Sequence, residues 1–424
     1  MTALGTSAPA ATRPAGPATV AARAGIGSDT AYGAVVPPPV LSSTFGFAAF
    51  GQKRQYDYTR SGNPTRDLLG DTLAELEGGA GGVVTATGMG AVTLVLSLLE
   101  PGDRLVVPHD CYGGCWRLFD ALAKKHHFVL ITADLTDPDQ VAAAVAGEPA
   151  IVWIETPSNP LLRITDIAAV SAAAHAVGAL VVVDNTFLSP ALQQPIALGA
   201  DIVVHSTTKY VNGHSDVVGG AVVSRDPAVH EQLSWWGNAL GLTGSPFDSY
   251  LTLRGLRTLG ARLRVHLENA EAVAYALLGH PAVAAVHWPG LPDHPGHALA
   301  ARQQQGFGAM LSVDLAGGSA AAEAFVNGLR YFTLAESLGG VESLVAHPAT
   351  MTHLAMTPEA RAAAGIGDGL LRLSVGIEDA VDLVADIEAA LTRALSVRLA
   401  QGVHAPIRLA QGRLAPSAAA AGRT

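Results

Sequence analysis

The sequence predicts an α/β protein in which a large domain with a mostly parallel sheet is followed by a smaller α+β domain. Short apolar runs alternate with helical segments from residue 64 to residue 225, which is the pattern of β-α-β units. Several of these runs are almost entirely apolar, as expected for strands that helices cover on both faces. The chain has 424 residues, which is enough for two domains of roughly 150 residues or more.

The large domain is expected to begin with a helix over residues 65–79, where leucines recur at helical spacing and glycines end the segment. Strands are expected after it at residues 82–87, 104–110, 127–133, 150–156, 179–186, 201–208 and 219–224. Helices are expected between them at residues 91–99, 116–125, 138–146 and 164–177. Ligands of such sheets bind at the carboxyl ends of the strands, so candidate site residues are sought there.

The smaller domain is expected to mix helices and strands. Helical spacing runs through residues 249–278, and a closing helix is expected at residues 379–394. Strands are expected at residues 283–288, 309–315 and 370–375. The chain then divides into a large domain at 62–256, a small domain at 257–397, an N-terminal arm at 25–61, and tails at 1–24 and 398–424 that are expected to be disordered.

Charge and hydropathy exclude several classes of partner. The formal net charge is −10, with 26 basic and 36 acidic residues, and no long basic stripe offers itself to nucleic acid. The longest apolar stretches, such as residues 91–99, fall short of the roughly 20 residues that cross a membrane. The N-terminus lacks the apolar core of a secretory signal. We therefore expect a cytoplasmic protein whose partners are small molecules.

The two cysteines, Cys111 and Cys115, stand four residues apart in DCYGGCWR. A zinc site needs further ligands at a workable spacing, and a disulfide framework needs a secreted context. We expect neither, so no metal site is predicted.

Two residues at strand ends point to pyridoxal phosphate. Lys209 ends the run IVVHSTTK, and Asp184 ends LVVVD. This cofactor needs a lysine amine that holds its aldehyde as a Schiff base, and a carboxylate that keeps its pyridine nitrogen protonated. Lysine and aspartate at strand ends are more often ordinary solvated residues, so the neighbouring strand ends must decide.

Those strand ends carry groups that suit the rest of the cofactor. The turn TGMGAV opens a helix, where the amides of Gly88 and Met89 favour an anion such as phosphate. Ser206 and Thr208 add hydroxyl donors beside the lysine. The ring of Tyr112 can stack on the cofactor or be a structural tyrosine. The amide of Asn159 can donate to the phenolic oxygen, or Asn-Pro can simply form a turn.

Longer segments carry a family resemblance. They are YDYTRSGNPTRD, ETPSNPLL, VVDNTFLSPALQ, HSTTKYVNGHSDVVGG, TLAESLGGVESL and LLRLSVGIED. These segments resemble the Cys/Met-metabolism family of pyridoxal phosphate enzymes over about residues 25–395. The resemblance implies the aspartate-aminotransferase-like fold (fold type I) of these transferases.

The resemblance also implies a role for each matching position. Lys209 is the Schiff-base lysine and proton shuttle, Asp184 faces the pyridine nitrogen, and Tyr112 and Asn159 contact the ring. The phosphate is held by Gly88, Met89, Ser206 and Thr208, and by Tyr58 and Arg60 of the neighbouring subunit. Arg372 binds the substrate carboxylate with its bidentate fork. The remaining substrate contacts are expected from Glu336, Ser337, Asp57 and Arg117.

The implied assembly is a homotetramer, a dimer of dimers with shared active sites. Arg60 is expected to lower the pKa of Tyr112, so that this tyrosine acts as a base when the substrate amine enters.

The implied reaction is a replacement at the γ-carbon of an activated homoserine ester. The segments PHDCYGGCWRLFD, WWGNALGLTGSPFDSYLTLRGLRTL, ARQQQGFGAML and AHPATMTH most resemble the branch that uses cysteine as nucleophile. Ser61 stands where some members of this branch have arginine, which leaves succinyl, acetyl and phosphoryl esters open. A γ-lyase, a sulfhydrylase that uses sulfide, and a cofactor-binding regulator without catalysis also remain open.

Overall fold

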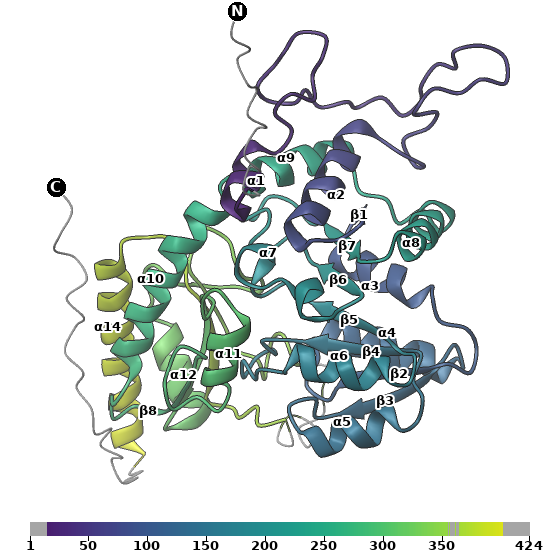
Figure 1. Cartoon of the computed structure of the whole chain (residues 1–424). Helices are drawn as coiled ribbons and strands as arrows, with labels where there is room; N and C mark the ends of the chain where they lie inside the picture. Colours follow the sequence, from purple (N-terminus) through teal and green to yellow (C-terminus); the bar gives the residue numbers. More distant parts are fainter. Residues whose placement is uncertain (1–14, 355, 357–360, 362–363, 402–424) are drawn as a thin grey trace, which may run out of the picture.

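The computed structural model describes residues 15–354, 356, 361 and 364–401. Expectations for residues 1–14 and 402–424 lie outside this part of the chain. Within it, the chain forms two sheets with their helices, and the expected α/β class is confirmed (Figure 1). None of the described helices combines the length and apolar character that a membrane crossing requires.

The large domain is built on a seven-stranded sheet with the order β1-β7-β6-β5-β4-β2-β3. Its strands are β1 (Gly81–Thr85), β2 (Arg104–Pro108), β3 (Val129–Ala133), β4 (Ile151–Glu155), β5 (Leu180–Asp184), β6 (Ile202–His205) and β7 (Gly220–Ser224). Only β7 runs antiparallel to its neighbours. Every strand expected here is present, and β4, β6 and β7 are buried along their whole length.

Helices cover both faces of this sheet. They are α2 (Pro64–Glu77), α3 (Gly88–Leu96), α4 (Gly113–Lys124), α5 (Pro138–Val145), α6 (Ile167–His175), α7 (Ser189–Leu192), the 3-10 helix η1 (Pro195–Leu198), α8 (Pro227–Leu240) and α9 (Pro246–Leu256). Helix α2 begins because the Asn63 side chain accepts hydrogen bonds from two amides of its first turn, and it ends at Gly78, whose φ is +76°. Helices α7, η1 and α8 were not among the expected elements.

The small domain carries a five-stranded sheet with the order β10-β11-β12-β9-β8. Its elements are α10 (Leu259–Leu277), β8 (Val283–His287), α11 (His297–Gln303), β9 (Met310–Leu315), α12 (Gly318–Val326), β10 (Thr333–Leu334), β11 (Leu344–Ala346), β12 (Leu370–Ser374) and α14 (Ala380–Ala400). The expected strands and closing helix are present. Helices α11 and α12 and the short strands β10 and β11 were not expected.

The expected limits of both tails need correction. Residues Pro17–Arg23 form helix α1, which packs on α2 and α10 and buries Ala21 and Ala24. Ala21 in the helix and Ala24 at its C-cap, both in a segment expected to be disordered, are therefore core residues. At the other end, α14 continues to Ala400, because its inward face stays buried as far as Arg398.

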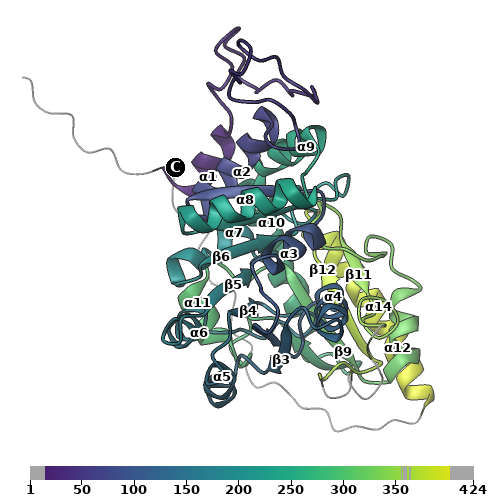
Figure 2. The ribbon, with the colours of Figure 1, turned by 90° about the vertical axis from the view of Figure 1, so that its right-hand side faces the viewer.

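The arm between α1 and α2 has little regular structure. Its described backbone contains only the isolated bridges Thr44–Tyr58 and Ala49–Gln52. Figures 1 and 2 show it projecting beyond the body of the molecule, above α2 and α9. Large apolar side chains on it are exposed, including Tyr32 at 94% and Phe50 at 106%. A single chain therefore leaves this segment without the packing that such side chains normally have.

Candidate active site

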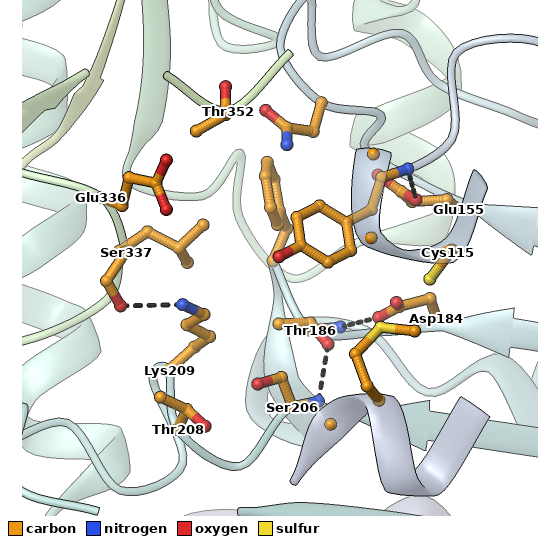
Figure 3. Close-up of a pocket in the computed structure, with 18 of the residues that line it drawn as sticks. Cys115, Glu155, Asp184, Thr186, Ser206, Thr208, Lys209, Glu336, Ser337 and Thr352 are labelled. Atoms are coloured by element: carbon orange, nitrogen blue, oxygen red, sulfur yellow. Dashed lines mark hydrogen bonds between the residues drawn. The ribbon is translucent and has the colours of Figure 1, made fainter. Parts of the chain in front are cut away.

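A cavity of about 660 Å³ opens at the carboxyl ends of the large-domain strands. It is closed on one side by the small domain, so both domains contribute to its wall (Figure 3). The predicted site residues that line it are Gly88, Met89, Tyr112, Arg117, Asn159, Asp184, Ser206, Thr208, Lys209, Glu336, Ser337 and Arg372. The expectation that strand ends would gather these residues is met, although they come from seven different segments of the chain.

Lys209 follows β6, and its amine faces the small domain. Its Nζ donates to Ser337 Oγ over 2.8 Å (Figure 3). The pKa of this amine is lowered to about 8, chiefly by burial and also by nearby Arg372, whereas Glu336 acts in the opposite direction. An amine with this pKa is partly unprotonated near neutral pH, as a nucleophile and proton acceptor must be.

Asp184 is the last residue of β5, and its position is fixed by Thr186. Asp184 Oδ1 accepts from the Thr186 amide over 3.0 Å, and Thr186 Oγ1 accepts from the Ser206 amide over 2.9 Å. Burial raises the pKa of the Asp184 carboxyl, and the bonds from Thr186 oppose that rise. A cationic partner in the cavity would therefore stabilise the ionised form.

The turn before α3 forms a cradle for an anion. The Thr87 side chain caps the helix by accepting from the Gly90 amide over 2.8 Å, while Gly88 and Met89 line the cavity. A Cβ atom at Gly88 would lie 2.8 Å from Ser206 Cβ, so a side chain there would collide with the opposite wall. Backbone amides, the helix dipole and a serine hydroxyl thus surround a space that only glycine leaves open.

Arg372 is a buried cation on the small-domain side of the cavity. It is 4% exposed, and it donates to Asn159 Oδ1 and to the Ser337 carbonyl, each over 3.0 Å. Its Nε is buried without a partner among the described residues. Burial lowers its pKa to about 10, so the guanidinium remains charged at neutral pH. Because Asn159 accepts through its oxygen, its NH₂ group is the end left to donate.

Tyr112 stands at the start of α4, and its ring, 42% exposed, lines the cavity. Its amide donates to Glu155 Oε2 over 2.7 Å. Burial raises the pKa of its hydroxyl, while Arg117 and Arg372 lower it by less. The expected lowering of this pKa is therefore wrong for a single chain, because burial outweighs the cations present and Arg60 is not among them.

Asp57, Tyr58 and Arg60 lie on the arm and do not line the cavity of their own chain. The Asp57 carboxylate accepts from Ser61 Oγ and from the Tyr58 amide, both over 2.7 Å. Arg60 donates to the carbonyl and side-chain oxygens of Asn238 at the end of α8, over 2.9 and 2.8 Å. A single chain thus forms the cavity, but its own Asp57, Tyr58 and Arg60 do not contact it.

Comparison with known proteins decides the family. A family model described as "Cys/Met metabolism PLP-dependent enzyme" matches residues 18–392. The chain belongs to this family. The predicted resemblance is confirmed, and pyridoxal phosphate is the cofactor of these enzymes.

Several members of this family are closely similar to the chain. A cystathionine γ-synthase from Xanthomonas oryzae pv. oryzae is 72% identical, covering 91% of this chain and 100% of that one with a TM-score of 0.90. Its crystal structures include complexes with cystathionine and with aminoacrylate and cysteine. Cystathionine γ-synthase from Escherichia coli strain K12 is 57% identical over 88% of this chain and 96% of its own length. A cystathionine γ-lyase from Lactobacillus plantarum is 43% identical over 89% of this chain and 99% of its own, with a TM-score of 0.86.

The cavity fits the family's cofactor. Gly88 lies so close to Ser206 that a Cβ atom would collide with it, and the missing side chain leaves the backbone of this helix start open to a phosphate. The Asp184 carboxyl, which also lines the cavity, has a raised pKa, which a protonated pyridine nitrogen would reverse. The Lys209 amine, with its pKa of about 8, is suited to bond with an aldehyde.

Sequence reasoning missed several residues of the cavity wall. They are Thr87, Glu155, Thr186, Thr352 and His353. Glu155 and Thr186 stand in quoted motifs, at or just after strand ends, so the rule that found Asp184 would have found them too. Cys115 also lines the wall, and both cysteines are free and buried. Burial raises the pKa of each thiol well above its ordinary value, which keeps the thiols protonated and unreactive.

Proposed function

We propose that this protein is a cystathionine γ-synthase. It joins the sulfur of cysteine to the γ-carbon of a homoserine ester, while the bond between that γ-carbon and the ester oxygen breaks. The leaving oxygen departs with the acid, the thiol gives up its proton, and the products are cystathionine and the free acid. The observation that carries this proposal is the 72% identity with the Xanthomonas oryzae enzyme over 91% of the chain. The cavity that we describe lies within that shared region. Amino acids are thus its substrates.

Pyridoxal phosphate is held by residues from several strand ends. Lys209 would bond to its aldehyde, Asp184 would pair with its pyridine nitrogen, and Tyr112 would contact its ring. Asn159 donates its free NH₂ group to the phenolic oxygen, and the amides of Gly88 and Met89, with Ser206 and Thr208, bind the phosphate. When bound, this cofactor withdraws electrons from the substrate Cα and so makes the neighbouring C–H bonds acidic.

Lys209 is the group that moves protons. When the substrate amine takes its place, the freed amine lies beside the substrate Cα, where its pKa of about 8 suits both removal and return of a proton near neutral pH. Ser337 Oγ, 2.8 Å from Nζ, holds the amine at this position. Asp184 stays ionised opposite the positive pyridine nitrogen and so stabilises the charge that accumulates there.

Arg372 binds the α-carboxylate of the substrate. Its contacts to Asn159 and Ser337 hold the guanidinium plane in place before substrate arrives, which reduces the entropy lost on binding. Glu336 and Arg117, which both line the cavity, are proposed to contact the distal part of the substrate. The charge of Glu336 suits the amino group of cysteine, and that of Arg117 suits a carboxylate.

A second copy of the chain completes the site. Tyr58 and Arg60 of one subunit bind the cofactor phosphate of its neighbour, and Asp57 contacts the neighbour's substrate. The exposed apolar side chains of the arm, such as Tyr32 and Phe50, support this arrangement, because they need a partner surface. We propose a homotetramer, built as a dimer of dimers, in the cytoplasm.

One experiment separates the remaining activities. Purified protein is supplied with O-succinyl-, O-acetyl- or O-phosphohomoserine, each with cysteine, with sulfide, or with water alone, and products are measured by mass spectrometry. We expect cystathionine from at least one ester with cysteine, faster than any product from water. Release of 2-oxobutyrate from added cystathionine as the main activity would instead establish a γ-lyase. This alternative is tested because the chain is 43% identical to the Lactobacillus plantarum γ-lyase. Coloured protein without any turnover would overturn the proposal in favour of a regulator.

A further inference from the structure

Glu155 is a buried acid whose purpose the reaction leaves unexplained. It is the last residue of β4, is 5% exposed and lines the cavity. Among the described residues it takes part in none of the ion pairs. Burying a carboxyl group in this way is unfavourable unless strong hydrogen bonds compensate. Its contacts therefore indicate its purpose.

Those contacts lead to the residues that surround the cofactor. Glu155 Oε2 accepts from the Tyr112 amide over 2.7 Å (Figure 3). The backbone amide of Asn159 lies near this carboxyl and favours its ionised form. Tyr112 and Asn159 are the residues proposed to contact the face and the phenolic oxygen of the ring. One carboxyl group thus accepts the backbone amide of Tyr112 and lies beside that of Asn159.

The local backbone explains why Tyr112 needs this support. Tyr112 is the N-cap of α4, and its own side chain makes no capping bond. The residues before it form the connection from β2, so the ring direction depends on how this turn is fixed. Burial, and neighbouring Asp184 to a lesser degree, raise the pKa of the Glu155 carboxyl well above its ordinary value. Its role here is therefore that of a hydrogen-bond acceptor, delivered from a rigid central strand.

The same strand pairing places Glu155 beside Asp184. The two residues are partners in the register of β4 and β5, whose strands lie about 4.8 Å apart in any sheet. The carboxyl that fixes Tyr112 and the carboxyl that faces the pyridine nitrogen are therefore built on one rigid pair of strands. This pair of strands thus fixes the position of the tyrosine ring relative to the cofactor ring.

We propose that Glu155 is a positioning residue that fixes the Tyr112 ring over the cofactor by accepting its backbone amide. Tyr112's contact with the cofactor rests on the proposed function, whereas the bond between Glu155 and Tyr112 does not. Without the acceptor, the turn before α4 can move, and the Tyr112 ring then no longer keeps one distance from the cofactor ring and one angle to it. Small displacements of this kind reduce turnover by about 10- to 100-fold.

Three variants test the proposal. Glu155→Ala removes the acceptor, whereas Glu155→Gln keeps an acceptor oxygen in a side chain of nearly the same size. Asp201→Ala is the matched control, because Asp201 is also a buried carboxylate that accepts a backbone amide, from Val181 over 2.8 Å, at the opposite end of the strands. If Glu155→Ala does not fold, Glu155→Leu replaces it, since leucine has a similar volume and no acceptor.

The first measurement is hydrogen exchange in the cofactor-free protein. We expect the Tyr112 amide to exchange at least tenfold faster in Glu155→Ala, and near the wild-type rate in Glu155→Gln. Asp201→Ala should leave this amide unchanged, although it lowers the melting temperature. Unchanged exchange in Glu155→Ala, or the same acceleration in Asp201→Ala, overturns the proposal. This result does not depend on which reaction the protein catalyses.

The second measurement is turnover of the loaded enzyme. We expect kcat/KM to fall about 10- to 100-fold in Glu155→Ala and to recover to within about threefold in Glu155→Gln. In a double-mutant cycle, Tyr112→Ala should have a smaller effect in the Glu155→Ala background than in wild type. Equal loss in both Glu155 variants, or additive effects in the cycle, overturns the positioning role. A wild type without activity on any homoserine ester would overturn the proposed function and leave the exchange result standing.

Discussion

The cavity and the arm are two halves of one predicted site, and they differ in how far a single chain completes them. The cavity residues are held by hydrogen bonds within the chain, as between Lys209 and Ser337 or Arg372 and Asn159. The arm carries Tyr58 and Arg60 on a projecting loop whose large apolar side chains are exposed. The difference supports the proposal that one subunit carries the reacting groups while a second subunit supplies Tyr58 and Arg60 to the phosphate.

The largest expected effect is on the cavity side. Replacing Lys209 with alanine removes the amine that bonds to the cofactor and moves protons, so turnover and the visible absorbance of the bound cofactor should both be lost. Lys124→Ala is the control, because Lys124 is an exposed lysine paired with Asp120 and such pairs contribute little. Normal turnover by Lys209→Ala would contradict the assignment.

The arm is tested by mixing two inactive variants. Arg60→Ala damages the arm, and Lys209→Ala damages the cavity, so each homo-oligomer should be inactive. After the two are unfolded and refolded together, about half of the dimers are mixed, and each mixed dimer has one intact site. We therefore expect about a quarter of the wild-type activity to return. Activity no greater than the sum of the separate variants would place Arg60 outside the neighbour's site.

A smaller effect is expected at the substrate carboxylate. Arg372→Lys keeps the charge but cannot donate to Asn159, Ser337 and a carboxylate at once. We expect KM for the homoserine ester to rise by about 10- to 100-fold, with a smaller change in kcat. Arg302→Lys, at an exposed pair with Asp166, should leave KM unchanged. A fall in kcat at constant KM would argue against a binding role.

The smallest effect concerns pH. Only the unprotonated Lys209 amine reacts with an aldehyde, and this form increases as pH rises through the pKa. The rate of cofactor binding to cofactor-free protein should therefore rise with a midpoint near pH 8, well below the 10.5 of an ordinary lysine. Glu336 raises this pKa, so Glu336→Gln should move the midpoint lower. Stopped-flow absorbance measures both, and a midpoint near 10 would contradict the described burial.

Most strands of the large domain and most residues of the cavity could be predicted, because the sequence patterns that mark them lie within short segments of the chain. Asp184 and Lys209 each follow a run of apolar residues, and a buried strand must end where its polar residues begin. Strands β10 and β11 have two and three residues, which is too short for any period to show. Their place in the sheet depends on pairing with β12, a contact that no local pattern encodes.

Other features escaped prediction because they depend on distant partners. The alanines of α1 resemble a disordered tail until α10, more than 230 residues later in the chain, covers them. The pKa of Tyr112 was expected to fall, but burial dominates in a single chain. The positions of Asp57, Tyr58 and Arg60 relative to a cofactor require a second subunit, so their roles remain predictions.

Helix α1 has a practical consequence for anyone who labels or immobilises this enzyme. It is fastened to the body by packing on α2 and α10, and by a hydrogen bond of 3.2 Å from Arg257 Nε to the Ala22 carbonyl. The arm is therefore a loop with both ends clamped, not a free strand. An affinity tag fused ahead of residue 15 is attached next to α1, which is packed on the body, and not to the arm. The surface of the arm therefore stays free for the proposed assembly.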